Sequence, residues 1–423
     1  MTRQERKVSG AADHTWKRNP RVVWLAELLA IMGFASTFPI YAYYIQSLGV
    51  ANNLVARWSG IVIAASSLTM GIMGPIWGSL GDRYGRKVMV IRAMFGGAVI
   101  IGLQGAAQSV EQFALLRLIQ GALTGTVTAA TALVASNTPR EHLGATLGRL
   151  QLAIFLGQAF GPITGGLVAD TLGYRATFWL TSVYLLVAGT LILVGVKEDF
   201  VPAPGAMEGT IWQRMHRDLR MILTGSLLGL VLGLRFALRV GLRMSSPTMP
   251  LIVQELMPGT TFLGSASGLL TTVSGVSSAI AAPFFGRRAD RGNARNTLMG
   301  CAFVAALAMI GQALAPTYGF LLLAQSMLGV GIGGTLAVIS AYVGRMAPTG
   351  KAGTAFGLDA MAVALSGTVG PALGGWVSDT LDRRAPLYAG GITMALAGLA
   401  VLRLPNEAKA TPSESEADQA RPG

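Results

Sequence analysis

Long apolar stretches recur along the whole chain and constrain its fold more than any other feature. A helix that crosses the hydrocarbon core of a bilayer needs about 20 mainly apolar residues, with its backbone hydrogen bonds made internally. The sequence therefore predicts an all-α membrane protein with twelve transmembrane helices. These lie roughly at residues 22–46, 57–78, 89–108, 112–135, 145–169, 175–196, 224–254, 263–285, 297–315, 318–343, 353–378 and 386–404.

The composition fits this prediction and excludes other classes. Of the 423 residues, 52% are apolar and 13% are charged, whereas about 25% are charged in a typical soluble domain. This apolar fraction is too high for a disordered chain. The chain has one cysteine, Cys301, and three histidines, so we expect no disulfide within the chain, no metal site and no cofactor. The first 20 residues are polar, and we expect no cleavable signal peptide.

The basic residues indicate the orientation of the helices. On one side of the predicted membrane, the loops and helix edges carry only Arg57, Arg175, Arg383 and Arg384 of the 33 Lys and Arg residues. Most of the others lie on the side of the two termini. By the positive-inside rule, both termini are expected in the cytoplasm of a protein of the cell membrane. This bias also accounts for the net charge of +13 without a nucleic-acid partner.

The two halves of the chain repeat each other. The run Gly-Pro-x-x-Gly-Gly at 161–166 recurs at 370–375, and Asp-Thr-Leu at 170–172 recurs at 379–381, each 209 residues later. Such a repeat predicts two pseudo-symmetric six-helix halves, at residues 21–196 and 222–404, around a central cavity. We expect residues 1–20 to be a cytoplasmic segment, 197–221 a cytoplasmic linker and 405–423 a disordered tail.

The loop between the second and third spans carries the first of three motifs. Its sequence closely resembles the G-x-L-a-D-r-x-G-r-k signature of the major facilitator superfamily. The resemblance implies a conformational latch on the cytoplasmic side, whereas the plainer interpretation is a basic loop that only obeys the charge rule. The matching residues are Gly78, Asp82, Arg83, Gly85, Arg86 and Lys87.

The fourth and fifth spans carry the other two motifs. Arg117 begins a run that resembles the R-x-x-q-G motif of proton-coupled members, which implies a role in proton coupling; alternatively, Arg117 is a structural arginine near the edge of its span. The fifth span resembles the g-x-x-x-G-P-x-x-G-G motif of the antiporters, whereas the plainer interpretation is close packing of small residues. Its matching residues are Gly157, Gly161, Pro162, Gly165 and Gly166.

Together the motifs extend the resemblance over residues 20–405, and the set is most similar to the twelve-span drug:proton antiporters. The resemblance implies a monomeric secondary transporter that exports small amphipathic compounds in exchange for protons by alternating access. The alternative is an exporter of one metabolite, such as a sugar, a siderophore or an amino acid. The sequence has no G-x-x-x-x-G-K-[ST] motif and no catalytic cluster, so we expect neither an ATP-driven pump nor an enzyme.

Two acids inside the spans are candidates for the proton site. Glu27 lies in the first span and Asp359 in the eleventh, each about 9 Å from a span end at 1.5 Å per residue. Glu27 is the first choice; alternatively it pairs with Arg21 or Lys17 at the interface. Asp359 is the second choice, and its alternative role is a latch partner for Arg83 or Arg86.

Three arginines of the seventh span recur every four residues and therefore share one helix face. Arg235, Arg239 and Arg243 are expected to pair with acids or to bind an anionic substrate. Alternatively, the span begins near residue 240 and they belong to an amphipathic cytoplasmic segment. Because drug cavities are mainly apolar with a few polar anchors, the candidates for substrate contact are Phe34, Phe38, Tyr41, Gln151, Phe155, Gln158 and Arg239.

Overall fold

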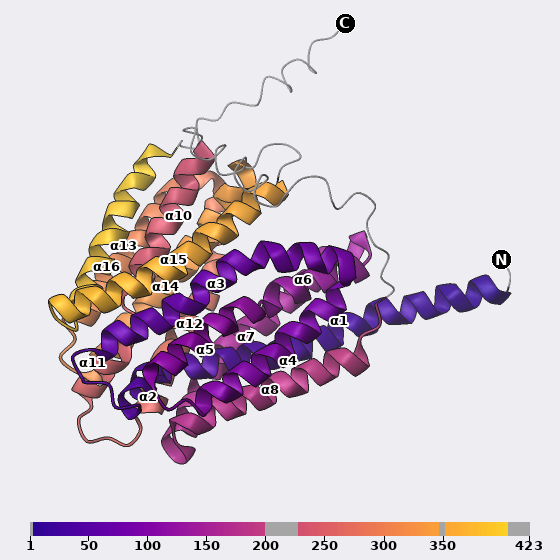
Figure 1. The fold of residues 1–423 in the computed structure, drawn as a ribbon. Helices are drawn as coiled ribbons and strands as arrows, with labels where there is room; N and C mark the ends of the chain where they lie inside the picture. Colours follow the sequence, from indigo (N-terminus) through magenta and orange to yellow (C-terminus); the bar gives the residue numbers. More distant parts are fainter. Residues whose placement is uncertain (1–2, 199–226, 347–351, 405–423) are drawn as a thin grey trace, which may run out of the picture.

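The computed structural model describes residues 3–198, 227–346 and 352–404, and within these ranges the chain is helical without a strand (Figure 1). The N-terminal half contains α1 (Arg3–Thr37), η1 (Phe38–Ile40), α2 (Tyr41–Ser47), α3 (Val55–Tyr84), α4 (Arg86–Gly105), α5 (Val110–Leu123), α6 (Thr126–Asn137), α7 (Arg140–Leu172) and α8 (Tyr174–Gly195). The C-terminal half contains α10 (Leu227–Met244), α11 (Met249–Leu256), α12 (Leu263–Arg288), η2 (Ala289–Asn293), α13 (Ala294–Ala313), α14 (Tyr318–Met346), α15 (Ala352–Thr380), α16 (Ala385–Ala400) and η3 (Val401–Arg403).

The prediction of twelve spans is confirmed. In the described part of the chain, ten helical stretches are long and apolar enough to cross a membrane. One of them, Leu263–Ala313, joins two spans across a turn at Arg291 and Gly292, where the backbone leaves helical geometry. The twelfth span is α10 with α11; α10 is not among the ten because three of its 18 residues are arginines.

In the part of the chain that the structure describes, three spans are interrupted. The first bends at η1, which contains Pro39, and the seventh breaks between α10 and α11, where Pro250 lies in the first turn of α11. Proline lacks the amide hydrogen that continues a helix, which explains both breaks. The fourth span breaks at Gly125, whose φ of +128° is accessible mainly to glycine. The sequence analysis did not predict this third break.

The two halves contact each other through two pairs of long helices. Helix α3 packs along α15, and α7 packs along α12 (Figure 1). The repeat relates the two pairs, since α3 corresponds to α12 and α7 to α15. Small residues let the backbones approach closely: a Cβ on Gly60 would overlap the carbonyl oxygen of Pro371, and one on Gly268 would overlap that of Pro162.

One end of the bundle, where α2 and α11 lie together, is fastened by polar contacts between the halves. We call it the α2 end, and the opposite end, which carries Gly78–Lys87, the latch end. At the α2 end the Tyr43 hydroxyl donates to the Pro250 carbonyl (2.6 Å), and Gln46 donates to Gln254 (3.1 Å). These bonds help to hold the halves together at this end.

Two aspartates at the ends of repeated helices complete this fastening. Asp170, on α7, accepts hydrogen bonds from the backbone amides of Gly264 (2.8 Å) and Ser265 (2.7 Å) in the first turn of α12. Its repeat partner Asp379, on α15, forms an ion pair of 3.4 Å with Arg57 in the first turn of α3. A carboxylate at a helix N-terminus is stabilised by free amides and by the helix dipole.

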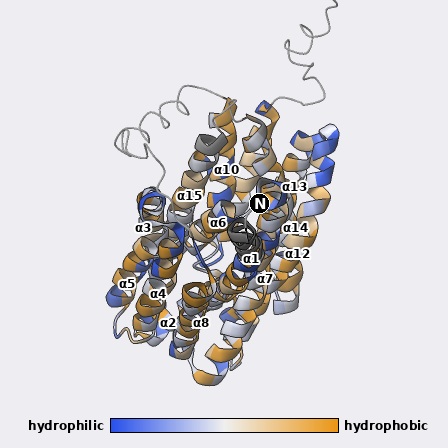
Figure 2. Ribbon diagram, turned by 90° about the vertical axis from the view of Figure 1, so that its right-hand side faces the viewer, coloured by the Kyte–Doolittle hydropathy of each residue, from blue (hydrophilic) through white to orange (hydrophobic). Residues whose placement is uncertain are grey.

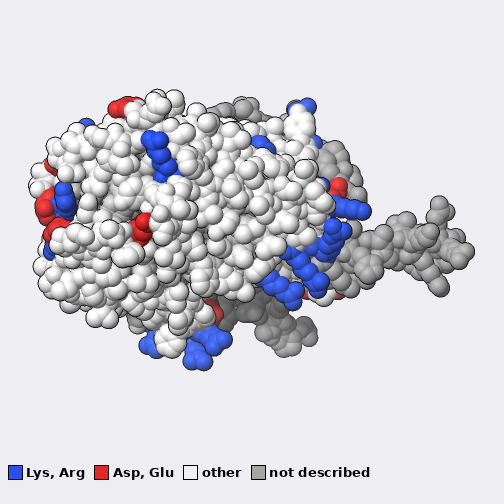
Figure 3. All heavy atoms as spheres, turned by 90° about the horizontal axis from the view of Figure 1, so that it is seen from below, with Lys and Arg blue, Asp and Glu red and all other residues white. Residues whose placement is uncertain are grey.

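The surface fits a membrane protein. Hydrophobic residues run along the lengths of the helices (Figure 2). On the face shown in Figure 3, few Lys, Arg, Asp or Glu residues lie in the middle, and Lys and Arg predominate at the right-hand end.

Parts of the predicted domain division can be placed. Helix α1 begins at Arg3, so the segment predicted at 1–20 continues the first span as helix. The predicted tail at 405–423 and most of the predicted linker at 197–221 lie outside the described residues.

We expect the Asp170→Ala variant to loosen the α2 end, because it removes two charge-assisted hydrogen bonds, each of about 1.5–3 kcal/mol. Spin labels on cysteines at the exposed positions 53 and 261, with Cys301 replaced by serine, should show an added population at longer distance. The control is Glu111→Ala, which removes an exposed acid. Equal distance distributions in the two variants would show that Asp170 does not hold the halves together.

Candidate functional site

Glu27 is the most deeply buried acid of the predicted site. Its side chain, on α1, has 0% of its surface exposed. The Thr126 hydroxyl donates to Oε1 at 3.2 Å, and Oε2 has no hydrogen-bond partner among the described residues. No ion pair joins Glu27 to Arg21. The side chain of Lys17, the other predicted partner, is not among those that the structure describes. Glu27 is thus a carboxyl group in the helix bundle with one oxygen unused.

The break in the fourth span explains the contact of Glu27. Thr126 is the first residue of α6, directly after Gly125. The break therefore places the start of a half-helix, with its positive dipole end, near the carboxyl group. Discontinuous helices line the ion and substrate sites of many transporters in this way.

Arg117 lies in a separate polar cluster, where its partners are neutral. Its guanidinium donates to the Gln120 side chain (2.8 Å), the Ser66 hydroxyl (2.7 Å) and the Val62 carbonyl (3.2 Å). The guanidinium also lies over the Tyr41 ring, 4.8 Å from its centroid. Arg117 is buried, with 6% of its surface exposed. The structure does not bring it into contact with Glu27.

Asp359 pairs within its own half. Its carboxylate lies 2.6 Å from Nε of Arg235 on α10, and Arg235 also donates to Ser340 on α14 at 3.0 Å. The alternative role as a latch partner for Arg83 or Arg86 is therefore not what the structure shows. The pair is buried where α10, α14 and α15 meet, and α10 is one continuous helix from Leu227 to Met244.

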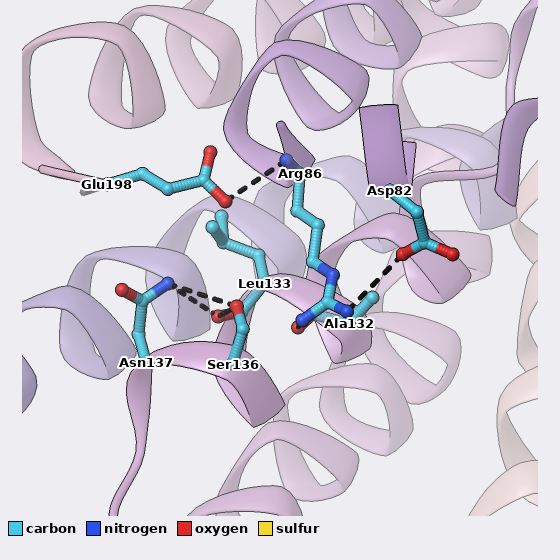
Figure 4. A network of polar contacts seen from close by, with 7 residues as sticks. All are labelled: Asp82, Arg86, Ala132, Leu133, Ser136, Asn137 and Glu198. Carbon is cyan, nitrogen blue, oxygen red and sulfur yellow. Dashed lines mark hydrogen bonds and ion pairs between the residues drawn. The ribbon is translucent and has the colours of Figure 1, made fainter. Parts of the chain in front are cut away.

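The latch segment, Gly78–Lys87, is held by contacts with the N-terminal half (Figure 4). Arg86 forms an ion pair with Asp82 (3.4 Å) and donates to the Ala132 carbonyl (3.3 Å). Glu198 accepts from the backbone amides of Arg86 (3.0 Å) and Lys87 (2.8 Å), the first residues of α4. In the described part of the chain, no hydrogen bond or ion pair joins this segment to the C-terminal half.

The remaining latch residues shape the turn between α3 and α4. Gly85 separates the two helices with a φ of +98°, which is why glycine occupies this position. The Lys87 ammonium donates to the carbonyl groups of Leu193 and Val196 at the end of α8. Arg83 lies over the Tyr84 ring, and space surrounds Gly78.

The glycines of the fifth span pack α7 against α1. A Cβ on Gly161 or Gly165 would overlap the α1 backbone at Met32 or Ser36, and one on Gly157 would press on Ile31. Gly166 faces the other half, where a Cβ would overlap Gly264. Pro162 lies inside α7 without ending it. Close packing of α7 against its neighbours therefore explains why these four positions are glycines.

The predicted cavity residues differ in exposure. Gln151, Phe155 and Gln158 are exposed, and Phe34, Phe38 and Arg239 are half-buried. Tyr41 is buried instead in an aromatic cluster with Phe113 and Phe178, at centroid distances of 5.8 and 6.3 Å. Its hydroxyl shares a hydrogen bond with Thr37.

Two acids with structural roles were missed by the sequence analysis. The repeat had already marked Asp170, because an aspartate recurs 209 residues later at the end of the equivalent helix. No comparable pattern marks Glu198, which lies just beyond α8 and caps a helix distant in sequence.

Comparisons with known proteins agree with this architecture. A family model described as Major Facilitator Superfamily matches residues 23–238 and again residues 231–422. The protein named "Multidrug resistance protein MdtG" from Salmonella heidelberg (strain SL476) is 30% identical over 373 residues, which is 88% of this chain and 91% of that protein. Its namesake from Enterobacter lignolyticus (strain SCF1) is 30% identical over 378 residues, or 89% of this chain and 90% of that protein.

A solved structure, that of a mutant of the nucleoside transporter NupG, superposes with a TM-score of 0.76 at 14% identity. The match covers 91% of this chain and 99% of that one. With the twelve helices and the two matching halves, these findings show that the chain is a multi-pass membrane transporter of the major facilitator superfamily.

Proposed function

We propose that the protein is a proton-coupled antiporter that exports small amphipathic compounds by alternating access. The names of the relatives MdtG support multidrug efflux. The observation that carries the proposal is Glu27, which is fully buried in the N-terminal half and has one oxygen without a hydrogen-bond partner among the described residues. An acid that is needed only for packing would be expected to have its oxygens satisfied.

The proposed proton site is the Glu27 carboxyl group. A proton on Oε2 removes the charge from the bundle interior, and its release restores a carboxylate next to the first turn of α6. The two forms thus favour different surroundings, as a coupling group requires. Asp359, with its partner Arg235, is the second candidate. Arg117, held by neutral groups, is proposed to organise the polar core around the fourth span.

The proposed transport cycle uses both ends of the bundle. Following the charge rule, we place both termini and the latch end in the cytoplasm. The fastened α2 end then faces outward, which supports assigning this structure to an inward-facing state. We further propose that the transporter is a monomer. In the opposite state the α2 contacts separate, and the latch segment meets the C-terminal half.

We expect Glu27→Gln to abolish proton-driven export while leaving the amount of folded protein unchanged, because glutamine keeps the shape but binds no proton. Transport is measured in inverted vesicles with a neutral, a cationic and an anionic amphipathic dye, with and without a protonophore. Glu111→Gln, an exposed acid, is the matched control and should behave as wild type.

Protonophore-sensitive export that survives Glu27→Gln would remove Glu27 from the mechanism and direct the search to Asp359. Export by the wild type that ignores the protonophore would contradict proton coupling itself. A wild type that moves none of the dyes would favour the exporter of a single metabolite.

We expect Glu198→Ala to loosen the latch segment and slow export. It removes two hydrogen bonds to a charged group, each of about 1.5–3 kcal/mol, and about 1.4 kcal/mol corresponds to a tenfold change in equilibrium. Hydrogen exchange at the amides of Arg86 and Lys87 should therefore rise at least about tenfold. Glu141→Ala, an exposed acid on α7, is the control. Unchanged exchange at these two amides would contradict the capping role of Glu198.

A further inference from the structure

One face of α10 carries three arginines, and the acidic residues around it are too few to neutralise their charge. Arg235, Arg239 and Arg243 lie one turn apart on one side of the helix. Arg235 forms an ion pair with Asp359 and donates a hydrogen bond to Ser340. No hydrogen bond or ion pair of the Arg239 or Arg243 side chain occurs among the described residues, and Nε of Arg239 is buried without a partner.

The helices packed against α10 offer no further acid. It contacts α14, α15 and α16. In the described parts of these helices, the acids are Asp359 and Asp379. Asp359 pairs with Arg235 and also attracts Arg239 electrostatically. Asp379 binds Arg57 at the α2 end. Glu255, on α11, pairs with Arg384. Among the described residues, the three guanidinium groups of this helix face therefore share the one carboxylate of Asp359, which leaves two positive charges in excess.

The position of these groups fits a cargo site. The seventh span runs from Leu227 to Leu256, and at 1.5 Å per residue Arg239 lies roughly 18 Å from its start and 25 Å from its end. An arginine side chain at such depth is costly in lipid and turns toward the protein interior or a water-filled cavity. Substrate sites of transporters with repeated halves lie near this depth.

We propose that Arg239, supported by Arg243, binds an anionic group of the exported compound. This inference rests on the proposed export function and assigns the substrate class of the same transporter. A guanidinium is planar and always charged, and it holds a carboxylate through two parallel hydrogen bonds. The cargo expected here is a small amphipathic oxyanion, most simply a carboxylate with an apolar body. Uncompensated positive charge also disfavours cationic compounds at this site.

The test compares an amphipathic carboxylate with its uncharged methyl ester. Binding is measured first, without a proton gradient, as the rise in Tm of the purified protein in a neutral detergent. We expect the carboxylate to stabilise the wild type and to lose this effect in Arg239→Gln, while the ester is unaffected by the substitution. Arg239→Lys should restore part of the binding, because it keeps the charge without the bidentate geometry.

Arg295→Gln is the matched control. Arg295, on α13, is a half-buried arginine of the same half, and its Nε also lacks a partner. Its removal should leave carboxylate binding at the wild-type level. Export in inverted vesicles is then measured for both compounds, and Arg239→Gln should raise the KM for the carboxylate at least tenfold while changing that for the ester less than twofold.

Three results would overturn the proposal: no stabilisation of the wild type by the carboxylate, equal losses for acid and ester in Arg239→Gln, or an equal loss in Arg295→Gln. Phosphatidylglycerol is added in a parallel arm, because a lipid phosphate offers similar chemistry. Stabilisation by this lipid but not by the carboxylate would assign the arginines to lipid instead. Since binding is measured without a gradient, a failure of proton-driven export is distinguished from a failure of anion recognition.

Discussion

The cost of a charged or polar group in lipid is the constraint on which this structure depends. A soluble protein can leave an arginine at its surface, but a membrane span must turn it inward and find partners for it. Arg117 meets this demand with neutral groups and an aromatic ring, whereas Arg235 meets it with a carboxylate. At Glu27 Oε2 and Arg239 Nε no hydrogen-bond partner occurs among the described residues, and these are the two groups to which we assign a proton and a ligand.

At the α2 end, the two copies of the repeat each provide a partner for a half-buried aspartate, and the two partners differ chemically. Asp170 and Asp379 occupy equivalent helix ends, and each reaches the first turn of a helix in the other half. Asp170 uses free backbone amides of α12, while Asp379 uses the side chain of Arg57. Both copies of the repeat therefore keep an aspartate that faces the first turn of a helix. They differ in the group that binds this aspartate, which is the backbone in one copy and an arginine side chain in the other. In the proposed transport cycle, both contacts are lost in the state in which the α2 end is open.

Much of the fold could be predicted from the sequence because span length and the repeat are properties of the chain itself. Twenty apolar residues define a crossing wherever they lie, and Pro39 and Pro250 mark bends through their missing amide hydrogens. The break at Gly125 was not predicted. Most glycines in these spans allow close packing of helices, and nothing in the sequence distinguishes them from the one that interrupts the fourth span. The partners of Asp359 and Glu198 were also not predicted, because pairing depends on how neighbouring helices are rotated, which one sequence does not specify.

The two halves divide the proposed chemistry by charge. Glu27 lies in the N-terminal half, with no basic partner among the described residues, and the excess arginines lie in the C-terminal half. In the proposed orientation, which places the termini in a negative cytoplasm, the membrane potential favours both an inward-moving proton and an outward-moving anion. Exchange of one proton for one monoanion moves two elementary charges, on the order of 5 kcal/mol per 100 mV. An anionic cargo would thus let the membrane potential drive export even where the pH gradient is small. With a neutral cargo, the exchange moves one elementary charge, so the contribution of the potential is half as large.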